Sequence, residues 1–123
     1  MRMRRILPIL LALLVLSPAV AVPHAYLVRS APARRAVLLR APARVQLWFN
    51  ERLESQFSRV SVWDGNGKQV DLGDAQVGPN DTTGLSVGIS PLVPGTYTVK
   101  FRVLSVDGHI VEGEFPFTLR ASP

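Results

Sequence analysis

The chain has 123 residues, enough for one domain at most, and its 47% apolar content suffices for one ordinary core. It contains no cysteine, which excludes disulfides, thiolate metal sites and thiol catalysis. Both methionines, Met1 and Met3, stand at the start, so the rest of the chain lacks the soft sulfur ligands that Cu(I) prefers.

The first 21 residues have the pattern of a secretory signal peptide. Three arginines within residues 1–5 precede an apolar run over 6–16, and Ala19-Val20-Ala21 offers the small residues that signal peptidase requires. The apolar run is shorter than a membrane-spanning helix. We therefore expect a cleaved leader over 1–21 and an exported, soluble, monomeric domain over 22–123.

The formal net charge of +5 owes much to this leader. Without it the chain keeps eleven Lys and Arg against nine Asp and Glu, a net charge of +2. Five arginines crowd residues 29–44, but no aromatic residues alternate with them as a nucleic-acid stacking platform requires. We therefore expect a solvated basic surface and no nucleic-acid partner.

Short alternating apolar runs, broken by proline and glycine, predict about seven strands. The expected strands are 25–29, 45–49, 57–63, 68–72, 85–89, 96–104 and 110–119. Residues 34–42 fit either a short strand or a helical turn, 73–83 read as a polar loop, and Pro116 indicates an edge or a bulge. No segment predicts a helix longer than two turns, so the expected fold is an all-β, immunoglobulin-like antiparallel sandwich.

Asp107 and His109 are the most ligand-like pair of side chains in the sequence. If Gly108 lets the chain run extended, both side chains project to the same side of the backbone. A carboxylate and an imidazole suit Cu(II) or Zn(II), and a third ligand is needed to close such a site. His24 is the other histidine of the chain. The alternative interpretation is a polar turn between strands without a metal.

Several short motifs, weak one by one, are specific in their order and spacing. They are His24-Ala25-Tyr26-Leu27, Ser30-Ala31-Pro32, Phe49-Asn50-Glu51, Gln56-Phe57-Ser58, Pro94-Gly95-Thr96-Tyr97, Ser105-Val106-Asp107-Gly108-His109 and Gly113-Glu114-Phe115-Pro116-Phe117. Together these motifs span almost all of 22–123. In their order and spacing the chain resembles the CopC-like periplasmic copper-binding proteins. The resemblance implies a Greek-key β-sandwich that holds one Cu(II) ion at one end.

The resemblance also implies which residues hold the metal. In that family the first histidine of the mature chain and the late Asp-x-His motif bind Cu(II), and these positions correspond here to His24, Asp107 and His109. Glu51 stands where some members have a further carboxylate, so it is a candidate weak axial ligand or a neighbour of the ligands. A polar residue that ends a strand is an equally good interpretation of Glu51. The methionines of the family's Cu(I) site have no counterpart here, so we expect a Cu(II)-only member.

One departure from the family concerns the mature N-terminus. Cleavage after Ala21 would leave Val22-Pro23-His24, whereas cleavage after Pro23 would free the His24 amine as a further ligand. Proline beside the scissile bond disfavours the second possibility. Pro23 also lacks an amide N–H, which excludes a Cu(II) site built on a histidine at position three.

The expected function is that of a periplasmic copper carrier or buffer, in copper resistance or in delivery to a membrane copper transporter of the CopD type. An oxidative polysaccharide-cleaving enzyme is the first competing class, but Asp107 would occupy the open position that oxygen activation needs. A metal-free adhesion or assembly module is the second. With two histidines in the chain, a catalytic triad has little material, so we expect no enzyme.

Overall fold

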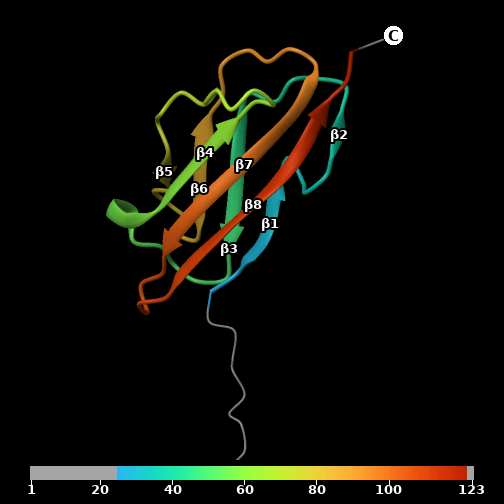
Figure 1. Ribbon diagram of the computed structural model, residues 1–123. Coiled ribbons are helices and arrows are strands. Elements are labelled where there is room, and N and C mark those ends of the chain that lie inside the picture. The colour runs from blue at the N-terminus through green and yellow to red at the C-terminus, as the bar shows by residue number, and fades with distance from the viewer. Residues whose placement is uncertain (1–24, 122–123) are drawn as a thin grey trace, which may run out of the picture.

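The computed structural model describes residues 25–121, which form two sheets packed face to face (Figure 1). The elements are β1 (Leu27–Ala31), β2 (Val37–Leu38), β3 (Arg44–Phe49), the 3-10 turn η1 (Ser55–Phe57), β4 (Arg59–Trp63), β5 (Gln76–Val77), β6 (Gly84–Gly88), β7 (Gly95–Leu104) and β8 (Ile110–Leu119). The predicted leader over 1–21 and the candidate ligand His24 lie outside the described residues.

The strands are shared equally between two four-stranded sheets. One has the order β1-β3-β6-β5 and the other β2-β8-β7-β4. Neighbours are antiparallel except for β2, which runs parallel to the end of β8 through Val37 opposite Thr118 and Leu38 opposite Leu119. The predicted all-β sandwich is confirmed. The sequence left segment 34–42 undecided between a strand and a helical turn. The segment contains β2 and leads the chain from the sheet of β1 to the sheet of β8.

Alternation of apolar and polar residues along the strands builds the core between the sheets. On β7, Tyr97, Val99, Phe101 and Val103 are buried, while Lys100 and Arg102 between them are exposed. Tyr97 stacks on Phe117 of β8 with ring centroids 5.5 Å apart. A side chain on each second residue points to the same face of a strand, so this pattern fixes which face of β7 meets the opposite sheet.

Some predicted strands differ from the structure. Residues 68–72 form only isolated bridges, because the segment crosses from one sheet to the other: Gln69 bridges to Trp63 of β4, and Asp71 bridges to Ile89, which follows β6. The Asp71 carboxylate also accepts the backbone N–H of Val62 in place of a ladder bond. The predicted polar loop 73–83 contains β5. Residue 57, expected to begin β4, belongs to η1 and is 60% exposed.

Pro116 pairs with Thr98 of β7 without a change of register, so the predicted bulge is absent from β8. On the other side of β8, β2 pairs only with Thr118 and Leu119, and Pro116 therefore lies where the described part of the sheet has its edge. At such an edge position the backbone nitrogen faces away from the neighbouring strand, so a proline costs the sheet no hydrogen bond.

Three segments far apart in the sequence meet at one end of the sandwich, the lower end in Figure 1. The start of β1 pairs with the end of β3, where Leu27 lies opposite Phe49. The loop after β3 reaches the β7–β8 turn, because Leu53 bridges to Ser105. The crossing through β2 lies towards the other end of the sandwich. Within residues 25–121, no helix has the length and apolarity that crossing a bilayer requires.

Candidate metal centre

The turn between β7 and β8 holds Asp107 and His109. Ser105 N–H donates to the carbonyl of His109 at 2.9 Å, and Gly108 N–H donates to the carbonyl of Ser105 at 2.9 Å. Gly108 has φ +93°, a left-handed conformation that glycine adopts without the steric cost of a Cβ. The expectation of an extended backbone at Gly108 is therefore wrong. A turn, not strand alternation, brings the two side chains together.

The two candidate ligands are in direct contact. His109 Nδ1 lies 3.2 Å from Asp107 Oδ1, and the side chains are 44% and 39% exposed, respectively. His109 Nδ1 itself is buried against the Asp107 carboxylate, so the solvent-exposed part of the ring is not the atom that contacts Asp107. The structure thus brings together two of the three predicted ligands, on a turn whose backbone is held by its own hydrogen bonds.

The Ser105 side chain orients the Asp107 carboxylate. Its side chain is buried, its hydroxyl donates to Asp107 Oδ1, and His109 N–H donates to its Oγ at 3.2 Å. The hydrogen bond from Ser105, followed by that from His109, lowers the pKa of Asp107 below the usual carboxyl value. Asp107 is therefore an anion at neutral pH, the form that a metal ligand requires.

The loop after β3 forms one wall of this end. Glu54 N–H donates to Leu104 O at 2.8 Å, and Val106 N–H donates to Arg52 O at 2.9 Å, so the loop is tied to both sides of the turn. Glu51 belongs to this loop and is half-buried. Among residues 25–121 no three metal-ligating side chains form a cluster, so the structure does not join Glu51 to Asp107 and His109.

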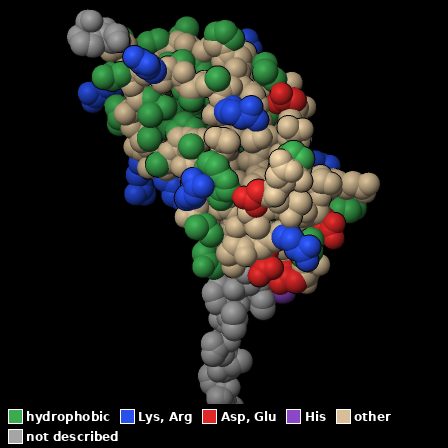
Figure 2. Space-filling model, turned by 180° about the vertical axis from the view of Figure 1, so that it is seen from behind, with side chains coloured by type: hydrophobic (Ala, Val, Ile, Leu, Met, Phe, Trp, Pro, Cys, Tyr) green, Lys and Arg blue, Asp and Glu red, His purple; other side chains and the backbone are tan. Residues whose placement is uncertain are grey.

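The start of the described chain forms the neighbouring wall. Tyr26 N–H donates to Asn50 Oδ1 at 2.7 Å, and Asn50 N–H donates to Tyr26 O at 3.2 Å. Ala25, the first described residue, is therefore held beside the loop that carries Glu51. Figure 2 shows acidic side chains and the histidine gathered at this end of the molecule.

Sequence reasoning assigned no role to Ser105 or Asn50, although both stand inside the quoted motifs. The available signal for Ser105 was its spacing, since a serine two residues before an aspartate in a turn commonly hydrogen-bonds locally. Asn50 had a weaker signal, because its side chain bonds to Tyr26, which lies 24 positions away.

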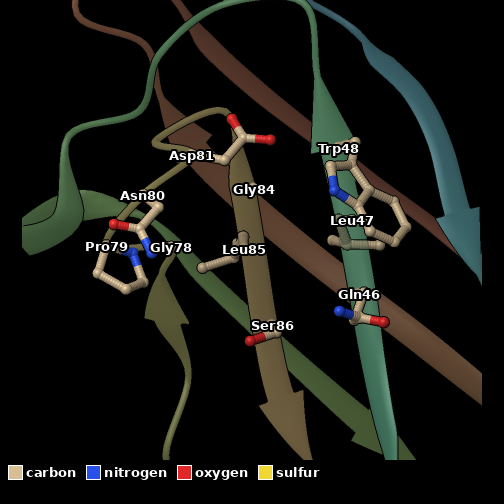
Figure 3. A pocket seen from close by; sticks show the side chains of 10 residues that line it. All are labelled: Gln46, Leu47, Trp48, Gly78, Pro79, Asn80, Asp81, Gly84, Leu85 and Ser86. Atoms are coloured by element: carbon tan, nitrogen blue, oxygen red, sulfur yellow. The ribbon is translucent and has the colours of Figure 1, made fainter.

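A hollow of about 250 Å³ lies elsewhere, on the outer face of β3 and β6 (Figure 3). Trp48 and Gly84 line it together with the loop that carries Asp81. The Asp81 carboxylate accepts hydrogen bonds from the backbone and hydroxyl of Thr83, which lower its pKa and engage it in its own turn. The lining residues include no histidine and one acidic residue, so this hollow is a poorer metal site than the β7–β8 turn.

Comparison with known proteins agrees with this fold. The CopC domain family matches residues 27–120. The chain is 34% identical to copper transport protein CutJ of Bacillus subtilis over 90% of its own length, but it spans only 21% of CutJ. It is 32% identical to protein YobA of Escherichia coli, covering 89% of this chain and 92% of YobA. Copper resistance protein C of Pseudomonas syringae is 33% identical, with 83% and 85% covered.

Solved structures give the same assignment. The crystal structure of CopC from Methylosinus trichosporium OB3b matches with a TM-score of 0.75 and 36% identity, covering 81% of this chain and 97% of that protein. PcoC, a methionine-rich copper resistance protein from Escherichia coli, matches with a TM-score of 0.67 and 30% identity over 80% of this chain and all of PcoC. The chain therefore belongs to the CopC domain family.

Proposed function

We propose that this protein is a copper carrier or buffer that binds one Cu(II) ion through His24, Asp107 and His109. The observation that carries the proposal is the contact of Asp107 with His109 at the end of the sandwich where the described chain begins. His24 directly precedes Ala25, the first described residue, in the sequence. The names of the relatives support copper as the metal.

The distance between the two ligand atoms fits a shared ion. Two donors each about 2.0–2.1 Å from a metal and at right angles to one another lie roughly 2.9 Å apart. Asp107 Oδ1 and His109 Nδ1 are 3.2 Å apart, and in the metal-free protein the imidazole donates a hydrogen bond to the carboxylate, so Cu(II) would have to displace that proton for both atoms to bind one tetragonal ion. Glu51 would serve at most as a weak axial ligand or as a neighbour of the ligands.

The sequence argues for Cu(II) alone. The chain has no methionine after Met3, whereas PcoC is described as methionine-rich. Imidazole and carboxylate donors suit Cu(II), and the general order of affinities favours Cu(II) over Zn(II) at such a site. A carboxylate in the ligand set also disfavours oxygen activation, so we propose a binding protein and not an enzyme.

Location and partner belong to the same proposal. The pattern of residues 1–21 supports cleavage of a leader and release of 22–123 into the periplasm. In CutJ, a copper transport protein, a segment similar to this chain makes up about a fifth of a longer polypeptide. We propose that the present protein passes copper to a separate membrane copper transporter, of the CopD type, by binding to it transiently.

Cu(II) titration followed by electron paramagnetic resonance tests this function. Protein recovered after its own leader cleavage should give one tetragonal nitrogen-and-oxygen signal per chain, and His109→Ala should abolish that signal. Asp64→Asn is the control, because Asp64 is also a turn aspartate with a lowered pKa but follows β4. A signal typical of loosely bound copper, unchanged in His109→Ala, would favour a metal-free adhesion module.

Intact mass of the same preparation settles the N-terminus. A chain that begins at Val22 would exclude ligation by a His24 amine and leave only its imidazole. A chain that begins at His24 would restore the amine and predicts tighter binding, because a second donor of the same residue closes a chelate ring.

A further inference from the structure

A basic and apolar surface surrounds β2, far from the candidate metal centre. It consists of the exposed side chains of Arg34, Arg35, Val37, Leu39, Arg40 and Arg120, which we call the β2 patch. β2 pairs with the last residues of β8, whereas the β7–β8 turn precedes the first residue of β8. With ten residues in β8 at about 3.3 Å per residue, the patch and the turn are separated by roughly 30 Å.

The apolar part of the patch is presented by strand alternation. Leu38 is half-buried and packs against the core, so its neighbours Val37 and Leu39 point outward. They are 56% and 58% exposed. The backbone beneath them is fixed, since Thr118 and Arg120 donate hydrogen bonds to carbonyls of this segment at 2.8 Å. The side chains of Val37 and Leu39 therefore project from a backbone that is held by hydrogen bonds to β8.

Among the described residues no carboxylate pairs with the charge of the patch, and its one aromatic contact is that of the Arg34 guanidinium, which lies 5.5 Å from the centroid of the Phe115 ring. Residues 25–50 contain five arginines and no acidic residue. The ion pairs within residues 25–121 join Arg102 to Glu112 and His109 to Asp107, so no patch arginine takes part in one. Outside residues 25–50 the mature chain has six basic and nine acidic residues. Figure 2 shows blue and green side chains together at the upper left, the position of β2 in that view, and red ones at the lower end.

We propose that the β2 patch docks the protein on a bilayer surface that contains anionic phospholipid. Arginines would pair with headgroup phosphates, while Val37 and Leu39 would enter the boundary with the acyl chains. Docking through β2 leaves the Asp107 and His109 end pointing away from the lipid, open to exchange of metal. The proposal does not depend on copper binding.

Charge favours this occupant over a second copy of the chain. A symmetric contact through β2 would place the same arginines opposite one another, and such like-charge contacts are unfavourable. An anionic bilayer instead supplies the negative charge that the described residues do not provide around β2. Each basic residue near such a surface strengthens binding by about fivefold at physiological salt.

Vesicle flotation tests the proposal with protein whose leader has been removed, as checked by intact mass, because the apolar run at 6–16 would bind lipid by itself. We expect flotation with vesicles of 70% phosphatidylcholine and 30% phosphatidylglycerol, loss of flotation in 0.5 M salt, and none with phosphatidylcholine alone. The triple variant Arg34→Gln, Arg35→Gln, Arg40→Gln should bind on the order of 100-fold more weakly.

A matched triple variant separates the patch from net charge. Arg59→Gln, Lys100→Gln, Arg102→Gln removes the same charge from the outer face of β4 and β7 and should keep most of the binding. Val37→Ser, Leu39→Ser should weaken binding several-fold without changing its salt dependence. Circular dichroism and the melting temperature identify any variant that fails to fold.

Three outcomes would overturn the proposal. They are no flotation with anionic vesicles, equal losses in the two triple variants, and a concentration-dependent dimer that Val37→Ser, Leu39→Ser abolishes. None of them bears on the copper titration, so failure here and failure of the proposed function can be told apart.

Discussion

The turn after β4 and the turn after β7 have similar backbones and different chemistry. Each contains a glycine in the left-handed region, Gly67 at φ +81° and Gly108 at φ +93°, and each holds an aspartate with a lowered pKa. Asp64 receives its hydrogen bonds from the backbone N–H groups of Asn66 and Lys68, at 2.8 and 2.9 Å. Asp107 receives its main hydrogen bonds from the side chains of Ser105 and His109.

This difference separates a structural aspartate from a candidate ligand. A carboxylate that caps its own turn cannot leave its backbone donors without loss of the turn. A carboxylate held by a hydroxyl and an imidazole can keep the hydroxyl and share the metal with the imidazole. The two turns therefore form a natural pair for testing, because a substitution at Asp64 should act on its turn alone and one at Asp107 should act on copper binding.

The largest expected difference follows from removing each carboxylate charge. Asp107→Asn should weaken Cu(II) binding on the order of 100-fold, because an amide is a much poorer ligand than a carboxylate. Asp64→Asn should leave the affinity unchanged. Competition with a chelator of known affinity measures both. Equal affinities in the two variants would contradict the assignment of Asp107 as a ligand.

Ser105→Ala should have the next largest effect. It removes the hydroxyl that orients Asp107 and should weaken Cu(II) binding roughly 10-fold, the lower end of the range for residues that position a metal ligand. The buried site also loses its hydrogen bonds, which should lower the free energy of unfolding by about 1–2 kcal/mol. Urea denaturation and chelator competition check these values. A variant with lowered stability and unchanged affinity would show that Ser105 serves the turn alone.

Replacement of Gly67 or Gly108 should have a smaller effect on copper binding, and the two replacements should lower stability by similar amounts. Gly108→Ala and Gly67→Ala should each lower the free energy of unfolding by about 1 kcal/mol, because alanine is strained at positive φ. Only Gly108→Ala should also alter copper binding, by a few-fold, since it tilts Asp107 against His109. If both variants bind copper alike, the geometry of the β7–β8 turn does not matter for the site.

The smallest effect concerns pH. The pKa of Asp107 is lower in the folded state than the ordinary carboxyl value, so ionised Asp107 stabilises the fold above that value and loses this effect as pH falls through the folded pKa. The difference in melting temperature between the parent and Asp107→Asn should have its largest value at pH 7 and should decrease below about pH 4. A difference that grows on acidification would contradict the lowered pKa.

Copper binding should respond to pH at a higher value than stability does. A protonated imidazole cannot bind a metal, so affinity should fall as the solution is acidified while the apo protein stays folded. Chelator competition at several pH values measures this loss.

Most of the fold could be predicted from the sequence because long strands carry a regular pattern. The run 96–104 alternates without interruption, and its expected limits differ from those of β7 by one residue. β2 and β5 have two residues each, too few for a period to be seen. Segment 68–72 has a strand-like pattern, but it crosses between the sheets and the Asp71 side chain replaces a ladder bond, neither of which a pattern reveals.

The candidate site could be predicted in part. Asp107 and His109 were found from their types and spacing, although a left-handed Gly108 brings them together and not an extended strand. The spacing of Ser105 to Asp107 signals a local hydrogen bond but not the burial of Ser105, and the role of Asn50 depends on a contact across 24 positions that local sequence does not reveal. His24 lies outside the described residues and stays a prediction.

The most direct test of the copper site is paramagnetic broadening of amide signals in a Cu(II) titration followed by nuclear magnetic resonance. Among the described residues, broadening at substoichiometric copper should be confined to 25–26, 50–54 and 105–110, the three segments that meet at the end of the sandwich with the β7–β8 turn. Signals of the Asp64 turn and of β2 should stay sharp, since they lie far from that end. Broadening centred on the hollow beside Trp48 and Asp81, or spread over acidic side chains without a centre, would contradict the proposed site.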